Sequence, residues 1–339
     1  MQAFSSERCK FDDYVMGFAA EKAALGRRVA IVTLLSIDGS SPRPLGAQMA
    51  VTETGEWAGY VSGGCLERAI VSEALDSLRA EQNRIVRYGK GSRYFDLQLP
   101  CGSAVDLLFD VTQGAPSFAA IDSRLSARVP ARMELELPGA PTEPAVVEYY
   151  PQRRLVVAGA GAAAASLGRL ASLSGFDVHL LTNDPATADH SCLPPDRITT
   201  LTRSCSAPTI AIDERTAIAF LFHDHDWEER LIADALATDA FYVGAMGSRR
   251  TAEKRASMLR NMGVDERHLS RLKAPAGLVS GAKSASDVAL SILSQVMAAE
   301  QAAQIPRFRL VRGERPSEWS VSSLAIDAWQ SFEGGACGI

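Results

Sequence analysis

The sequence predicts an α/β protein of two domains: an N-terminal α/β domain on a mixed sheet, and a C-terminal Rossmann-like domain with a doubly wound parallel sheet. Three observations support this fold class. The 339 residues are 47% hydrophobic and 22% charged, which is sufficient for two folded cores. From residue 154 onward, strand-like segments alternate with helix-like segments, as in a parallel sheet. A glycine-rich turn at Gly159 and Gly161 opens the first of these helices.

The N-terminal domain is expected over residues 1–113. An apolar-periodic helix is predicted at 11–25, and a buried strand is predicted in the continuous apolar run at 29–35. The other expected elements are two short strands, a helix and a closing strand, at 49–52, 57–61, 66–78 and 105–111.

A shift in composition marks the segment after this domain, residues 114–152. It is rich in proline, with Pro116, Pro130, Pro138, Pro141, Pro144 and Pro151. We predict a connector that has some structure of its own, because residues 133–137 alternate like an edge strand.

The Rossmann-like domain is expected over residues 153–305, and residues 306–339 are expected to form a tail. Strands are predicted at 155–158, 177–181, 216–222 and 241–246, and helices at 162–173, 227–237, 251–261 and 285–301. The last helix starts with Ser284 and Asp287 in the spacing of a capping box.

The turn after the first Rossmann strand has the residue types of a phosphate-binding turn. Gly159 permits the tight turn, Gly161 lets a phosphate approach the backbone, and Ala164 is small enough for close helix–strand packing. The alternative is a turn made small for packing alone. A dinucleotide site normally has an acidic residue at the end of the next strand, where this chain has Thr182, with Asp184 two residues further on.

Two thiols lie on predicted turns of the first domain. Ser62, Gly63, Gly64 and Cys65 fall where a strand turns into a helix, so their amides attract anions and the helix start lowers the pKa of the thiol. Cys101 and Gly102 lie on a turn before a strand. The alternative for each cysteine is that of a small buried side chain.

Polar residues also follow two later Rossmann strands, at the carboxyl end where open parallel sheets bind ligands. The segment His223, Asp224 and His225 is predicted either to bind a metal or move protons, or to form a polar loop that caps the next helix. At Gly247, Ser248 and Arg249 the arginine is predicted to clamp a phosphate; the alternative is a solvated side chain.

Composition excludes several function classes. The net charge of -5 and the scattered basic residues argue against nucleic-acid binding. Early charges argue against a signal peptide, and no span approaches the roughly 18 apolar residues that cross a bilayer. We therefore expect a cytoplasmic protein without membrane contact, whose six cysteines are free thiols.

Several long motifs occur in the order found in a known family. They are residues 39–47 (GSSPRPLGA), 62–67 (SGGCLE), 100–102 (PCG), the Rossmann turn, 223–226 (HDHD), 242–249 (YVGAMGSR), 274–278 (APAGL) and 281–282 (GA). With these motifs the chain resembles the XdhC/CoxI family of accessory proteins for xanthine dehydrogenase and related molybdenum hydroxylases. It departs from the family at Ala162, where a histidine is frequent, and at Thr182, where an acidic residue is frequent.

The resemblance implies a maturation factor rather than a catalyst. Such a chaperone binds molybdenum cofactor (molybdopterin), supports its sulfuration by a cysteine desulfurase and delivers it to a xanthine dehydrogenase-like molybdenum hydroxylase; a homodimer is expected. Cys65 and Cys101 are then the candidate molybdenum ligands. The candidate cofactor-binding residues are Ser62, Gly63, Gly64, Cys65, Cys101, Gly102, Gly159, Gly161, Ala164, His223, Asp224, His225, Gly247, Ser248 and Arg249.

Two other functions stay open at the level of the sequence. One is an NAD(P)-dependent oxidoreductase that uses the Rossmann domain, with His223 or His225 moving protons. The other is a non-catalytic adaptor that only docks a hydroxylase.

Overall fold

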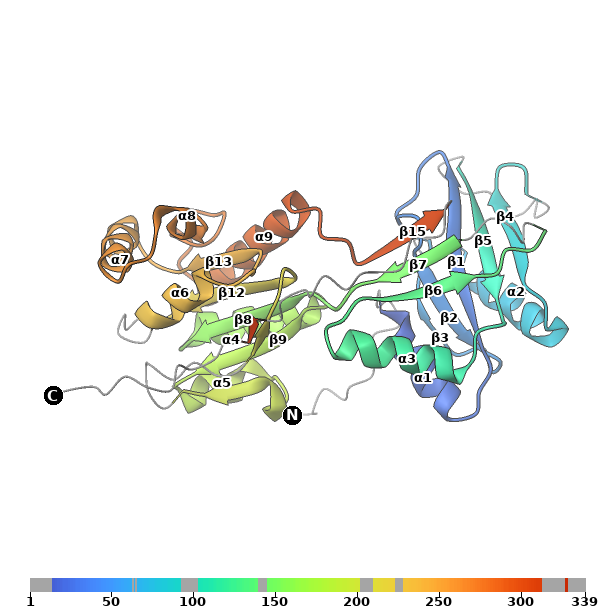
Figure 1. Cartoon of the computed structure of the whole chain (residues 1–339), viewed down its shortest axis with the longest axis horizontal. Coiled ribbons are helices and arrows are strands. Elements are labelled where there is room, and N and C mark those ends of the chain that lie inside the picture. The colour runs from blue at the N-terminus through green and yellow to red at the C-terminus, as the bar shows by residue number, and fades with distance from the viewer. Residues whose placement is uncertain are drawn as a thin grey trace. The chain divides into compact units, whose positions relative to one another are not determined.

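A computed structural model describes residues 14–62, 64, 66–92, 103–139, 145–201, 210–222, 228–312 and 327–328. The chain divides into two units, one made of residues 1–151 and 306–319 and the other of residues 152–305 and 320–339. Figure 1 shows antiparallel strands in the first unit and a parallel sheet flanked by helices in the second. The predicted fold class is confirmed, with antiparallel pairing throughout the described sheets of the first unit.

The main sheet of the first unit has five strands in the order β3-β2-β1-β5-β4. The strands are β1 (Val29–Asp38), β2 (Gln48–Thr52), β3 (Trp57–Gly59), β4 (Arg84–Gly89) and β5 (Ala104–Asp110). Alternate residues of β1 serve two cores, since Val32 faces one and Ile31 the other. The helix α2 (Glu67–Ala80) covers the first of these faces with Ile70, Ala74 and Leu78, on the periodicity that predicted it.

The other face of this sheet is covered by elements from both ends of the chain. They are α1 (Val15–Ala24), α3 (Ala115–Ser126) and a second sheet of order β15-β7-β6, with β6 (Ala131–Leu135), β7 (Ala145–Tyr149) and β15 (Phe308–Arg312). The predicted connector, 114–152, does not link two domains, because all of it except Gln152 belongs to the first unit. The start of the predicted tail, from Pro306, belongs to the same unit. The reason is burial: Met133 and Val147 pack into the same core as Ile31.

The second unit is built on a six-stranded parallel sheet in the order β10-β9-β8-β12-β13-β14. Its strands are β8 (Arg154–Gly159), β9 (Asp177–Thr182), β10 (Ile198–Thr200), β12 (Thr216–Leu221), β13 (Tyr242–Ala245) and β14 (Leu272–Lys273). The order reverses between β8 and β12, as in a Rossmann sheet, where ligands bind at this switch point. A short pair, β11 (Ala211–Ile212) and β16 (Asp327–Ala328), is separate from the sheet.

Helices cover both faces of the parallel sheet. They are α4 (Ala162–Leu173), α5 (Pro185–Ser191), α6 (Glu229–Leu236), α7 (Arg249–Asn261), α8 (Glu266–Leu269) and α9 (Ala285–Ala302), with a 3-10 turn at Pro195–Arg197. The predicted cap of the last helix is present, since the Ser284 side chain accepts a hydrogen bond from the Asp287 amide at 3.1 Å. Among the helices of the described chain, none has both the length and the hydropathy to cross a bilayer.

Candidate functional site

The motif segments 39–47, 60–66 and 90–103 of the sequence adjoin strand ends that lie at one end of the first sheet. We call this group of strand ends, with the described residues next to them, the motif end. The antiparallel register places them together, because Asp38 at the end of β1 pairs with Ala104 at the start of β5, and Gly89 at the end of β4 pairs with the same residue. The start of β2 and the end of β3 meet in the same way. Of the predicted residues there, Ser62 and Gly64 are described, whereas Gly63, Cys65, Cys101 and Gly102 lie outside the described residues.

A buried contact closes the loop that contains Cys65 in the sequence. The Ser62 hydroxyl lies 2.8 Å from both carboxylate oxygens of Glu67, and the Ser62 amide donates to Oε1 at 3.2 Å. The Leu66 amide donates to the Ser62 hydroxyl at 3.1 Å. Ser62 is 7% exposed and Glu67 6% exposed. We refer to this contact as the Ser62–Glu67 clasp; it holds the first turn of α2 against the end of the preceding loop.

An arginine connects the first two motif loops. The Arg43 guanidinium lies 4.1 Å from the centre of the Tyr60 ring, and its Nη1 donates to the Tyr60 hydroxyl at 3.0 Å. The Phe308 ring of β15 lies 5.9 Å away. Arg43 thus brings positive charge to the motif end on an aromatic support. It lies within the motif 39–47, but sequence reasoning did not single it out, because its partner is distant in the chain.

Ser103 links the first motif loop to the start of β5, directly after Cys101 and Gly102 in the sequence. Its buried hydroxyl accepts a hydrogen bond from the Ser40 amide at 2.9 Å. A Cβ added at Gly39, whose φ is +98°, would lie 2.7 Å from that hydroxyl oxygen. Close approach of the two segments therefore requires glycine at this position.

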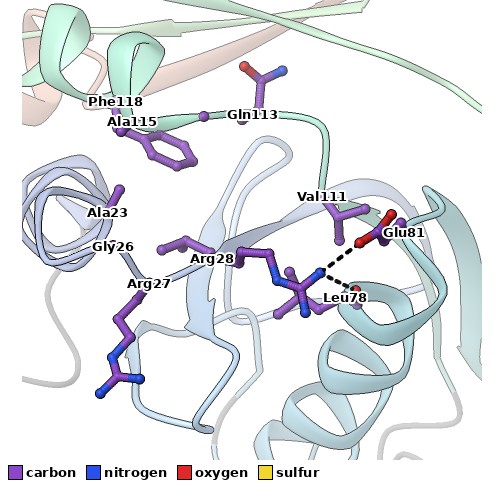
Figure 2. A pocket seen from close by; sticks show the side chains of 12 residues that line it. Ala23, Gly26, Arg27, Arg28, Leu78, Glu81, Val111, Gln113, Ala115 and Phe118 are labelled. Atoms are coloured by element: carbon purple, nitrogen blue, oxygen red, sulfur yellow. Dashed lines mark hydrogen bonds and ion pairs between the residues drawn. The ribbon is translucent and has the colours of Figure 1, made fainter.

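A separate pocket of about 400 Å³ lies at the other end of the first sheet, where β1 begins and β5 has ended. Figure 2 shows Arg28 inside it, directed to Glu81 and to the carbonyl of Leu78, each at 3.1 Å, while Arg27 points away. Arg28 also pairs with Glu53 at 3.1 Å. The charge of Arg28 is thereby neutralised, and none of the predicted site residues lines this pocket.

In the second unit, the described site residues lie at the carboxyl ends of neighbouring strands. The turn 159–161 follows β8, and the turn 247–249 follows β13, with β12 between these strands. The predicted residues His223, Asp224 and His225 follow β12 in the sequence and lie outside the described residues; helix α6 begins at Glu229, two residues after the predicted start.

The glycine turn after β8 has the predicted geometry. A Cβ at Gly159 would lie 2.8 Å from the Leu221 backbone, and Gly161, the N-cap residue of α4, has a φ of +91°. Ala164 is fully buried. However, the Gly161 amide is not available to a ligand, because it donates to the hydroxyl of Thr187 at 2.6 Å. The amides that can bind a ligand are those of the following residues, in the first turn of α4.

The carboxylate nearest the expected ribose position has a structural role. Asp184 is the N-cap of α5 and accepts from the Ala186 and Thr187 amides at 3.2 and 3.0 Å. The hydrogen bond from the Thr187 hydroxyl, followed by these amides, holds the pKa of Asp184 below its usual range. Thr182, at the end of β9, is only 1% exposed. The carboxylate that an NAD ribose requires is therefore engaged in capping.

The described side chains form no group of three or more His, Cys, Asp or Glu residues arranged to hold a metal ion. Cys192 is the free thiol among the described residues, and it is exposed. The candidate ligands Cys65 and Cys101 are not among the side chains considered for a metal site, because they lie outside the described residues.

Comparisons with known proteins identify relatives of both units. Residues 155–296 match the model of the XdhC Rossmann domain, and residues 23–89 match the model of the XdhC and CoxI family. The molybdenum cofactor insertion chaperone PaoD of Escherichia coli K12 is 33% identical over 300 residues, which cover 84% of this chain and 88% of that protein.

More distant relatives agree. A protein of Bacillus subtilis 168 described as a probable subunit of xanthine dehydrogenase is 21% identical over 309 residues, covering 79% of this chain and 92% of that protein. A crystal structure described as a xanthine dehydrogenase from Bacillus halodurans has the same fold, with a TM-score of 0.71 and 19% identity over 91% of this chain and 99% of that one. The protein described above is therefore a member of the XdhC and CoxI family.

Proposed function

We propose that this protein is an accessory chaperone that binds molybdenum cofactor, supports its sulfuration and delivers it to a xanthine dehydrogenase-type molybdenum hydroxylase. The observation that carries the proposal is the gathering of three motif loops at one end of the first sheet. The relationship to a molybdenum cofactor insertion chaperone supports it.

The chemistry of the cargo matches the residues near the motif end. Molybdenum cofactor carries a phosphate, a metal held by a dithiolene and a flat pterin. In our proposal Cys65 and Cys101 supply thiolates, which are the soft ligands that such a metal accepts. Arg43 supplies positive charge for the phosphate, and the amides of Gly63, Gly64 and Gly102 supply hydrogen-bond donors.

We propose that the Rossmann turns form a separate anion-binding site in the second unit. The amides that follow Gly161 in α4 form one anion-binding position at the carboxyl end of the sheet, and Gly247, Ser248 and Arg249 form another. His223, Asp224 and His225 follow the strand between them and complete the proposed set. The oxidoreductase alternative is disfavoured, because Asp184 is engaged in capping α5 rather than presented to a ribose.

Partners and assembly follow from the proposal. We expect a cysteine desulfurase to dock during sulfuration, the hydroxylase to dock during delivery, and the chaperone to be a cytoplasmic homodimer. Sedimentation velocity tests the dimer, and co-purification with tagged desulfurase tests the first docking step.

The test of cargo binding uses the full chain purified from a host that makes molybdenum cofactor and from a matched host that does not. We expect molybdenum and a fluorescent oxidised pterin in equal amounts in the first preparation alone. Cys65→Ala and Cys101→Ala should each lower both contents, whereas Cys192→Ala, which removes an exposed thiol of the other unit, should not. Absence of metal and pterin from the wild-type protein would refute cargo binding.

A further inference from the structure

A buried ion pair in the second unit joins helix α7 to the residue that precedes helix α6. Arg255 is 3% exposed and Glu228 is 1% exposed. Arg255 Nη2 donates to Glu228 Oε1 and also to the carbonyl of Met246, the latter at 3.2 Å. Glu228 is the N-cap residue of α6, which follows β12, and Met246 follows β13. One guanidinium therefore connects α7 with the start of α6 and with the turn after β13.

The second amino group of this guanidinium has no acceptor within the described part of the chain. Arg255 Nη1 is buried and makes no hydrogen bond to any described residue. It lies 3.8 Å from the position that a Cβ on Gly247 would take. A buried cationic donor without an acceptor is unfavourable, and such a donor at the carboxyl end of a parallel sheet indicates that a ligand supplies the acceptor.

The turn above Nη1 is shaped for a small anion. Gly247 is exposed, and its φ of +150° together with the Thr251 Cγ2 atom, 3.1 Å from where a Cβ would lie, requires glycine at the point of the turn nearest the buried amino group. Ser248 is the N-cap of the 13-residue helix α7 and accepts from the Thr251 amide at 3.1 Å. The amides of Arg249 and Arg250 precede this capped amide, in the first helical turn, where backbone donors and the helix dipole favour negative charge.

We infer that the turn 246–250 and Arg255 form a phosphate-binding site. One phosphate oxygen accepts from Arg255 Nη1, and the other oxygens accept from the amides of Arg249 and Arg250. The exposed Arg249 side chain adds charge and donors that match a dianionic phosphate better than a carboxylate. Arg255 is the residue that sequence reasoning missed, because only the fold brings it beneath the turn.

This inference rests on the proposed function in one respect, namely that the turn after β13 is an anion-binding position. The shared chemistry is a phosphate group, and its source is either a free anion or a phosphate ester carried by a larger ligand. The site follows β13, which lies beside β12 and one strand from the switch point between β8 and β12.

Calorimetric titration of the full-length protein with pyrophosphate tests the site, with inorganic phosphate and a nucleoside diphosphate as parallel probes. We expect saturable binding to the wild type and an affinity about tenfold lower for Arg255→Lys, which keeps the charge but loses the second amino group. Arg249→Ala, which removes the exposed guanidinium of the turn, should lower the affinity similarly. The control Lys254→Ala, exposed on the same helix, should leave the affinity unchanged.

Circular dichroism and thermal unfolding check that each variant is folded. If Arg255→Lys does not fold, the affinity of Arg249→Ala decides the test. Tighter binding of the nucleoside diphosphate identifies an ester as the source, and equal binding identifies the free anion. Lack of saturable binding of every probe to the wild type, or wild-type affinity in both folded variants, would overturn the site. If molybdenum and pterin are retained while no probe binds, this inference fails and the chaperone proposal stands. If the probes bind and the protein contains neither molybdenum nor pterin, the chaperone proposal fails and this inference stands.

Discussion

The hydroxyl group of Ser62 lies 2.8 Å from each carboxylate oxygen of Glu67, and the two side chains are buried together. The carboxylate sits in the first turn of α2, where the helix dipole favours its charge. The clasp connects the backbone at Ser62 with the first turn of α2 at Leu66 and Glu67. It therefore positions described residues on both sides of Cys65 in the sequence.

Glu67→Ala should therefore lower cofactor retention and destabilise the first unit. Removing the acceptor leaves buried donors of Ser62 unsatisfied, at a cost of about 1–3 kcal/mol. Glu67→Gln keeps an acceptor oxygen and should retain most of the cofactor. The measurements are molybdenum and pterin content together with the free energy of unfolding. Asp76→Ala, exposed on the same helix, serves as the control. Full cofactor retention by Glu67→Ala would show that the clasp does not organise the loop.

Arg43 offers a second test at the motif end. Arg43→Ala removes the stacking on Tyr60, for which about 0.5–2 kcal/mol is typical, and the charge proposed for the cofactor phosphate. We expect a several-fold loss of retained pterin, with a smaller loss in Arg43→Lys. Arg79→Ala, which removes an exposed arginine of α2, should match the wild type. An unchanged pterin content in Arg43→Ala would remove Arg43 from the binding site.

The pH dependence of the second unit should depend on Asp177. Burial opposes the charge of this carboxylate, but the His179 ring and the charges of Arg154 and Arg197 outweigh burial and lower its pKa. Arg154 lies 2.7 Å and Arg197 2.9 Å from its oxygens. Since the folded pKa lies below the unfolded value of about 3.9, the stabilisation is present above that pH and is lost as the pH falls toward the folded pKa.

Asp177→Asn should destabilise the protein by on the order of 3 kcal/mol at neutral pH and flatten the acid limb of its stability curve. Urea unfolding from neutral to acidic pH measures both effects. Asp196→Asn, at an exposed carboxylate of the neighbouring turn, provides the comparison and should follow the wild type. An Asp177→Asn curve parallel to the wild type would contradict the assigned pKa direction.

Thr187 should stabilise the glycine turn through its hydroxyl. It accepts from the Gly161 amide at 2.6 Å and donates to Asp184. Thr187→Val removes the hydroxyl at nearly constant shape and should cost about 1–2 kcal/mol, whereas Thr187→Ser should stay close to the wild type. Thermal unfolding compares both with Thr200→Val at an exposed threonine of β10. Equal stability of the Val and Ser variants would mean that the hydroxyl does not support the turn.

The regular elements could be predicted where local signals agree. Helix α4 has the predicted bounds, because a glycine N-cap and a glycine after its last turn delimit a run of good helix formers. Strand β4 was missed, since only Val86 and Tyr88 are buried along it while Ile85 is exposed. Strand β15 was missed because its partner β7 is distant in the chain, and no local pattern specifies that pairing.

The candidate site shows the same division. Ser62, Gly161 and Gly247 could be singled out because glycine and serine at strand ends have a local meaning. The partners Thr187 and Arg255 act through contacts that only the fold creates, whereas Glu67 is five residues from Ser62 and forms a local contact at the start of α2. Cys65 and Cys101 were singled out from the sequence alone, and they lie outside the described residues.

Transfer of molybdenum from this protein to an apo-hydroxylase is the measurement that tests the central claim most directly. The loaded chaperone is incubated with a purified cofactor-free xanthine dehydrogenase-type enzyme, the proteins are separated by size, and the metal content and hydroxylase activity are followed. We predict that molybdenum moves to the large enzyme and activity appears, and that chaperone purified from the cofactor-free host or carrying Cys65→Ala supports neither. Molybdenum that stays on the chaperone while activity remains absent would contradict the account.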